Sequence, residues 1–193
     1  MFAHALGDGA ELGMLEPWHA EEFLETVERS REHLLAAIPV AHHVHTIDDA
    51  RAYLQRFADG HAKDVEHLFG IRLDAALVGV VMLFSFDTTN ATCEMGVWLA
   101  PQAQGRGLVT QACRYVLDWA IRVRGMKRVQ WTHSPANVRS RAVAGRLGMT
   151  HEGVLRSAWT LGGVRTDNVV WSVLAEEWPT KAIASVDDLP DQV

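Results

Sequence analysis

The 193-residue chain has few cysteines and no long apolar segment. Its two cysteines, Cys93 and Cys113, are too few for a disulfide framework, so we expect them to be core residues of a protein in a reducing compartment. The longest apolar run, residues 77–86, is broken by Ser85 and is far shorter than the roughly 18 residues that cross a bilayer. The first residues lack the basic and apolar regions of a signal peptide. The sequence therefore predicts a cytoplasmic protein with no membrane partner.

Basic residues are fewer than acidic residues. The chain has 18 Lys and Arg against 24 Asp and Glu, a formal net charge of -6 at pH 7, and its basic residues are dispersed. Nucleic-acid-binding surfaces are concentrated positive patches, so we exclude nucleic acid as the main partner. With 48% apolar residues, the chain is long enough for one core. We expect an N-terminal tail (residues 1–9), one domain (residues 10–178) and an acidic C-terminal tail (residues 179–193).

Hydrophobic periodicity predicts an alternation of strands and helices in the order βααβββαβαββ. The expected strands are residues 11–16, 65–73, 77–86, 92–99, 127–132 and two that turn near Gly162 and Gly163, and the expected helices are residues 17–35, 48–58, 107–124 and 138–147. The strand, helix and strand over residues 92–132 predict one parallel crossover in an otherwise antiparallel sheet. We therefore expect a mixed α/β fold with a twisted, mostly antiparallel sheet of six or seven strands and about four flanking helices.

A loop with two glycines, residues 101–107, separates the strand 92–99 from the long helix 107–124. Gly105 and Gly107 let the backbone approach a ligand, and the free amides at the helix start favour an anion such as phosphate. The loop is no dinucleotide fingerprint, because the third glycine position holds Thr110, and the chain contains no GxxxxGK[ST] motif. A glycine pair alone also fits a bare helix cap, so the anion site needs a second signal.

That second signal is Asn137 and Ser140 at the start of the helix 138–147, with Gly148 and Met149 at its end. Together with QxxGxG and the element order, these residues resemble the GNAT superfamily of N-acetyltransferases, most closely its RimJ/RimL-like, ribosomal-protein branch. The resemblance covers about residues 10–178. It includes the stretches REHL (31–34), GVWL (96–99), GRGLVTQA (105–112) and HEGVLR (151–156). The combination of motifs is specific, whereas each one alone is not.

The resemblance implies a binding site for acyl-CoA, with acetyl-CoA as co-substrate and no metal. In the family the QxxGxG loop cradles the pyrophosphate; the corresponding residues, here called the glycine loop, are Gln104, Gly105, Arg106, Gly107, Leu108, Val109 and Thr110. The family's pantetheine arm pairs with the end of the preceding strand, which corresponds to Val97, Trp98 and Leu99. An amide there would polarise the thioester carbonyl. Asn137 matches the asparagine that contacts this arm, and Ser140 matches the hydroxyl near the sulfur.

The sequence departs from the family pattern at Ala144, where many members have the tyrosine that protonates the leaving thiolate. Ser140 is the candidate substitute, and its expected role is a hydrogen bond to the thiolate with water supplying the proton. Glu94 is the candidate base, because strand alternation puts it on the face opposite Cys93 and Met95. The alternative for Glu94 is a strand-face carboxylate in a salt bridge. An α-amino group, with a pKa of about 8, needs only a weak base.

The sequence thus predicts an acyl-CoA-dependent N-acyltransferase that transfers acetyl to a primary amine by direct attack in a ternary complex. The branch implies a protein N-terminal α-amine as acceptor and a homodimer as assembly. The same scaffold would also suit acetylation of a small amine or antibiotic, or a catalytically silent acyl-CoA sensor. His42, His43 and His45 lack further metal ligands nearby, and nothing in the sequence activates Cys113 as a nucleophile. Asp167 either meets the acceptor amine or bonds a neighbouring turn.

Overall fold

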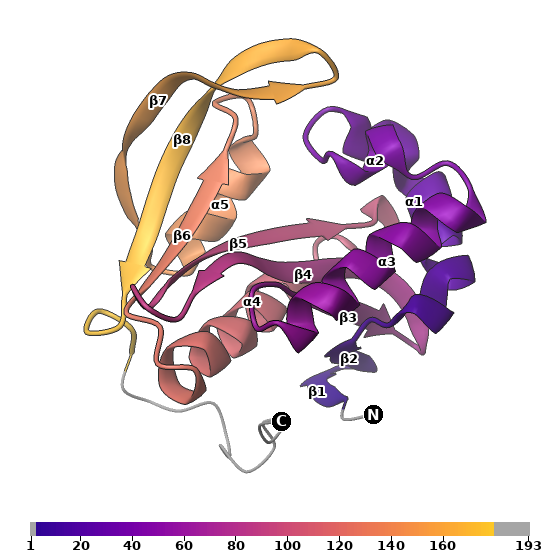
Figure 1. Ribbon diagram of the computed structural model, residues 1–193, viewed down its shortest axis with the longest axis horizontal. Coiled ribbons are helices and arrows are strands. Elements are labelled where there is room, and N and C mark those ends of the chain that lie inside the picture. The colour runs from indigo at the N-terminus through magenta and orange to yellow at the C-terminus, as the bar shows by residue number, and fades with distance from the viewer. Residues whose placement is uncertain (1–2, 180–193) are drawn as a thin grey trace.

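The computed structural model describes residues 3–179 and contains one eight-stranded sheet with helices on both faces (Figure 1). The strands are β1 (His4–Gly7), β2 (Ala10–Met14), β3 (His67–Leu73), β4 (Ala76–Asp87), β5 (Thr92–Leu99), β6 (Arg128–His133), β7 (Thr150–Leu161) and β8 (Val164–Leu174). They lie in the order β1-β2-β3-β4-β5-β6-β8-β7. Neighbouring strands are antiparallel except β5 and β6, which are parallel.

Five α-helices flank the sheet. They are α1 (Ala20–Leu35), α2 (Val40–His43), α3 (Ile47–Ala62), α4 (Leu108–Asp118) and α5 (Val138–Arg146), and a π-helical turn (Trp119–Val123) extends α4. Local chemistry fixes where helices begin. Thr46 caps α3 by accepting a hydrogen bond from the backbone of Asp49 at 3.1 Å. The residue directly before α4 is Gly107, whose φ of +75° suits glycine.

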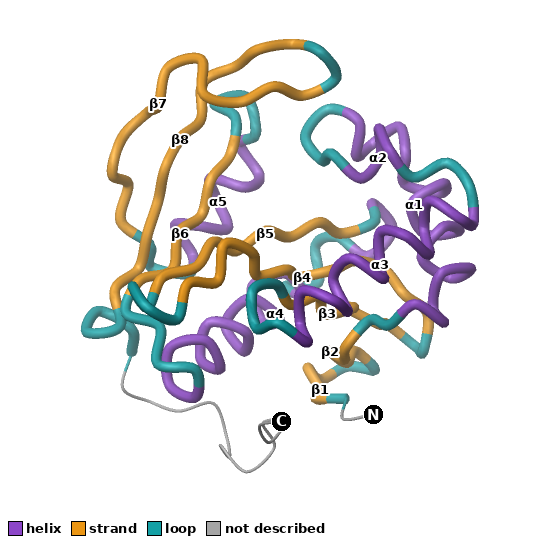
Figure 2. The backbone as a smooth tube through the Cα atoms, in the orientation of Figure 1, coloured by secondary structure: helices purple, strands orange, loops and turns teal. Residues whose placement is uncertain are grey.

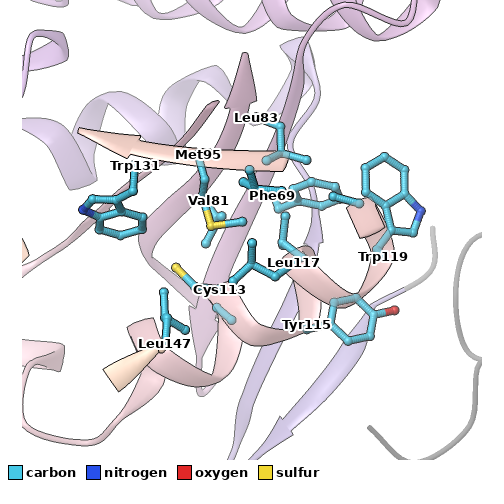
Figure 3. Close-up of a cluster of buried hydrophobic side chains, with 14 of the residues drawn as sticks. Phe69, Val81, Leu83, Met95, Cys113, Tyr115, Leu117, Trp119, Trp131 and Leu147 are labelled. Atoms are coloured by element: carbon cyan, nitrogen blue, oxygen red, sulfur yellow. The ribbon is translucent and has the colours of Figure 1, made fainter. Parts of the chain in front are cut away.

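Each face of the sheet has its own hydrophobic core. On one face α1 and α3 cover β3, β4 and β5 with side chains such as Phe23 and Leu54, both fully buried. On the other face α4 packs on the same strands, and Figure 3 shows Cys113 and Leu117 of α4 close to Met95 of β5. The central strands are therefore buried on both sides, which fixes the orientation of every side chain along β5.

The structure confirms the mixed fold and the parallel crossover, but it has more strands than the sequence analysis predicted. The additional strand is β1, which lies in the segment expected to be an N-terminal tail. A turn with positive φ at Gly7, Asp8 and Gly9 reverses the chain, so Ala5 pairs with Glu11. The first strand predicted, residues 11–16, is β2 at Ala10–Met14.

The remaining differences are small. The segment between the first two predicted helices contains the one-turn helix α2. The acidic tail predicted for residues 179–193 lies outside the described residues from position 180 onward. Within residues 3–179, no helix is both long and apolar enough to cross a membrane.

Candidate active site

The pairing of the parallel strands β5 and β6 ends halfway along β5. They pair from Thr92 opposite Arg128 to Met95 opposite Trp131. Beyond Met95, no strand within the described chain pairs with the β5 edge that faces β6, and Figure 2 shows the two strands diverging. Val97, Trp98 and Leu99 follow on this open edge, so their backbone is placed where the sequence analysis expected an extended ligand arm to pair.

The glycine loop follows the open edge after one short turn, and a buried residue anchors it at each end. Ala103 and Leu108 are buried in the core beneath α4, whereas residues 105–107 are exposed. Gly105 and Gly107 have φ values of +80° and +75°, and a Cβ built on Gly105 would meet nothing within 4 Å. No side chain caps α4, so the amides of its first turn are open to an anion. The loop therefore fits the phosphates of a cofactor.

Four side chains that the sequence analysis did not single out lie around the glycine loop. The amide nitrogen of Gln104 is 2.9 Å from His33 Nε2, and Arg139 Nη1 is 3.5 Å from both nitrogens of the same ring. Arg146 Nε donates to Thr110 Oγ1 over 3.3 Å, and Arg114 Nη2 donates to the Arg146 carbonyl over 3.3 Å. These contacts bring positive charge to the loop.

The two arginines of α5 near the loop could have been found from the sequence. Arg139 and Arg146 are seven residues apart on the predicted helix, which places both on one face. His33 left no such signal, because it meets Gln104 only through the packing of α1 against the sheet.

Ser140 and Asn137 lie together at the start of α5. The Asn137 side chain caps the helix by accepting a hydrogen bond from the Ser140 amide at 3.1 Å. The indole nitrogen of Trp131 donates to Ser140 Oγ over 2.8 Å, so the hydroxyl proton of Ser140 remains free to be donated to a ligand. Ala144, which takes the place of the absent tyrosine, is fully buried in the core and has no hydroxyl group to offer.

Glu94 lies on β5 with its carboxylate turned toward two side chains of β6. Thr132 Oγ1 donates to Glu94 Oε1 over 2.6 Å, and Gln130 Nε2 donates to Oε2 over 3.4 Å. Burial raises the pKa of Glu94, and these two neutral donors oppose the shift only in part. Both partners are uncharged, so the contact is not the salt bridge that the sequence analysis held as the alternative. The arrangement provides a partly desolvated carboxylate that takes up a proton more readily than an exposed glutamate.

The other candidate residues have structural partners. Asp167 Oδ1 accepts from the Ser157 amide over 2.7 Å. Ser157 lies inside β7, where the pairing with β8 is irregular, so Asp167 bonds the neighbouring strand and not the turn that the sequence analysis considered. His42 Nε2 lies 2.9 Å from the Leu35 carbonyl. Cys113 is fully buried, and burial raises the pKa of its thiol, which keeps it from acting as a nucleophile. In the described part of the chain, no three His, Cys, Asp or Glu side chains are placed to hold a metal ion.

Comparison with known proteins gives consistent matches over most of the chain. The sequence profile described as "Acetyltransferase (GNAT) domain" matches residues 14–150. YdaF of Bacillus subtilis (strain 168), named as a candidate ribosomal N-acetyltransferase, is 28% identical over 183 residues, which are 92% of this chain and 98% of YdaF. The matched segment contains β5, the glycine loop and α5.

Two solved structures extend the match to the whole architecture. The crystal structure of a probable acetyltransferase has a TM-score of 0.86 at 28% identity, covering 92% of this chain and 99% of that chain. The microcin C7 self-immunity acetyltransferase MccE, crystallised with acetyl-CoA and AMP, has a TM-score of 0.82 at 26% identity, covering 88% of this chain and 94% of that chain.

Proposed function

The chain belongs to the GNAT acetyltransferase family, and on that premise we propose that it transfers acetyl from acetyl-CoA to the α-amino group of a protein N-terminus. The observation that carries the proposal is the exposed, uncapped glycine loop at the start of α4, directly after the unpaired edge of β5. The amides of the loop hold the pyrophosphate, and the backbone of Val97, Trp98 and Leu99 pairs with the pantetheine arm and polarises the thioester carbonyl.

Two side chains then handle the protons of the reaction. Glu94 removes a proton from the acceptor amine, which attacks the thioester carbonyl directly and forms the new C–N bond as the C–S bond breaks. Ser140, which accepts from Trp131, donates its free hydroxyl proton in a hydrogen bond to the departing thiolate, and water supplies the proton that the thiol keeps. Asn137 orients the start of α5 and offers its amide nitrogen to the arm.

The weak base favours an α-amino group as acceptor. Glu94 has neutral partners and a raised pKa, yet a carboxylate is a poor match for a lysine amine, whose pKa is about 10.4. An α-amino group, with a pKa of about 8, is partly neutral at cellular pH, so a weak base such as a carboxylate can take its proton. The name of YdaF, which refers to ribosomal N-acetylation, supports the same acceptor class.

Thiol release with paired acceptors tests this assignment. The full chain is incubated with acetyl-CoA and a peptide that has a free N-terminus and no lysine, or with the N-blocked form of that peptide carrying one lysine. We expect release of CoA thiol and a mass increase of one acetyl group with the first peptide only, and neither with Gly107→Glu. Equal acetylation of the blocked lysine peptide would overturn the α-amine assignment.

A small amine is the second candidate acceptor, because MccE is an acetyltransferase of antibiotic self-immunity with the same architecture. Turnover with small amines such as a polyamine or an aminoglycoside, without turnover of any peptide, would establish it in place of the first. Thiol release with no acceptor at all, despite acetyl-CoA binding, would indicate a sensor. The homodimer stays a prediction from the family resemblance, and light scattering of the full chain measures it.

A further inference from the structure

A single imidazole connects helices α1 and α5 with the glycine loop. His33 lies in the last turn of α1, its Nε2 is 2.9 Å from the Gln104 amide nitrogen, and its ring is 3.5 Å from the Arg139 guanidinium of α5. Gln104 is the first residue of the glycine loop. Helix α1 therefore contacts the glycine loop and α5 through one half-buried side chain.

The glycine loop has few other supports. Residues 105–107 are exposed, and Gly105 and Gly107 lack the side chains that would restrict their backbone. Within residues 3–179, the side-chain hydrogen bonds that join the loop to other elements are Gln104 to His33 and Thr110 to Arg146. The Thr110 contact lies inside α4, beyond the glycines. At the entry to the loop the His33 contact is the side-chain hydrogen bond, and it adds to the buried Ala103 and to the backbone hydrogen bond from the Gln104 amide to the Pro101 carbonyl at 3.2 Å.

We propose that His33 is a positioning residue that, through Gln104, holds the glycine loop in the conformation that receives the phosphates of acetyl-CoA. The inference rests on the proposed phosphate-binding role of the loop. A neutral imidazole accepts the Gln104 N–H at Nε2, which fixes the side chain and with it the backbone before Gly105. The benefit is preorganisation: a loop that is already in place loses less conformational entropy when the ligand binds.

The chemistry around the ring makes this contact sensitive to protonation. Arg139 of α5 is the charged group that faces the ring, Gln104 of the loop is uncharged, and within the described chain no carboxylate lies within ion-pair distance of His33. Burial, and next the Arg139 charge, lower the pKa of His33, so the ring is neutral at pH 7. An imidazolium has no acceptor, so protonation would replace the Gln104 hydrogen bond with two opposing donors.

Calorimetric titration of acetyl-CoA into the full chain tests the proposal without knowledge of the acceptor. His33→Ala removes the acceptor atom and is expected to raise Kd roughly 3- to 10-fold at pH 7.5, the usual effect of one lost hydrogen bond. His33→Gln retains an acceptor oxygen and is expected to stay within about 2-fold of the wild type. The control is Glu32→Ala, an exposed neighbour on α1 that should leave Kd unchanged.

The pH profile separates positioning from general stability. Between pH 7.5 and pH 5 the wild type should lose affinity relative to His33→Gln, because only the imidazole titrates, and protonation of the ligand affects both proteins equally. Each ligand-free variant is also melted, and if His33→Ala unfolds, the pH profile of His33→Gln against the wild type carries the test alone.

Four results would overturn the proposal. Equal Kd values for His33→Ala and the wild type would show that the loop needs no such support. A constant ratio of wild-type to His33→Gln affinity across pH would do the same. A wild type that binds more tightly as pH falls would show that the ring acts as a cation toward the phosphates. If Gly107→Glu binds acetyl-CoA as well as the wild type does, the proposed role of the loop fails first, and the inference fails with it.

Discussion

Replacement of Glu94 by glutamine should remove most of the activity without harming the fold. Glutamine has nearly the same shape, and its carbonyl oxygen still accepts the hydrogen bond that Thr132 Oγ1 donates to Glu94 over 2.6 Å. What disappears is the group that takes the amine proton. General-base catalysis contributes about 10²- to 10⁴-fold, so we expect kcat to fall by that factor, or roughly 3 to 5 kcal/mol in barrier height.

Stability should change in the opposite direction. Burial raises the pKa of Glu94, so the folded protein holds this proton more tightly than the unfolded chain does. A raised folded-state pKa contributes stability that is complete below the unfolded pKa and is lost as pH rises through the folded pKa. The amide of Glu94→Gln never ionises. We therefore expect the variant to gain stability relative to the wild type as pH rises from about 4.5, the ordinary pKa of Glu, through the raised folded-state pKa.

The assay is thiol release at saturating acetyl-CoA and acceptor, with urea unfolding of the same preparations. Glu152→Gln is the matched control, because Glu152 is a second carboxylate bonded to β6 and β8. Arg128 and Ser172 hold the pKa of Glu152 at about 2, which makes it a poor base, so its loss should leave kcat within about 3-fold. The reasoning is refuted if Glu94→Gln keeps kcat within about 3-fold of the wild type, or if Glu152→Gln loses as much activity.

Three further changes have definite expected outcomes. Ser140→Ala should lower kcat about 10- to 100-fold, the effect of one hydrogen bond to a charged group, with acetyl-CoA affinity unchanged by calorimetry; an unchanged kcat would mean that water alone handles the thiolate. Leu117→Ala, at a fully buried position under the sheet, should lower the free energy of unfolding by about 2 to 5 kcal/mol in urea, and a loss below about 1 kcal/mol would contradict its place in the core. Glu152→Gln should be less stable than the wild type above about pH 4.5, and the difference in the free energy of unfolding should vanish toward pH 2. The reason is that a lowered folded-state pKa contributes stability that is lost as pH falls through that pKa. A difference in stability that grows in acid would contradict this expectation.

The fold was largely predictable from the sequence because its strongest signals are local. The alternation of residues 92–99 and the apolar face of the following helix predict the buried strand, the crossover and the face of Glu94 without any long-range contact. β1 was missed because it is only four residues long. Its pairing with β2 depends on the turn at Gly7, Asp8 and Gly9, and the Asp8-Gly9 pair is a hairpin signal that the sequence analysis did not use.

The site was predictable in its backbone parts and less so in its side-chain partners. The glycine loop and the start of α5 are contiguous motifs, and a motif carries its own geometry. The hydrogen bonds from Thr132 to Glu94, from Trp131 to Ser140 and from Gln104 to His33 join residues of different elements, which are not contiguous in the sequence. They follow from the register of β5 against β6 and from the packing of α1, which only the complete fold determines.

The separation of β5 and β6 explains how one sheet can present both of the groups that we propose to handle protons, Glu94 and Ser140. Side chains alternate along β6, so Thr132 holds Glu94 on the face covered by α1 and α3, while Trp131 holds Ser140 on the face of α4 and α5. A closed sheet would keep these two groups on opposite sides of a hydrogen-bonded wall. Because pairing ends at Met95 and Trp131, directly beside both contacts, a thioester lying along the open edge of β5 can meet the amine from one face and Ser140 from the other. A substitution at residues 96–99 that closes the gap between β5 and β6 should therefore remove activity, even with Glu94 and Ser140 intact.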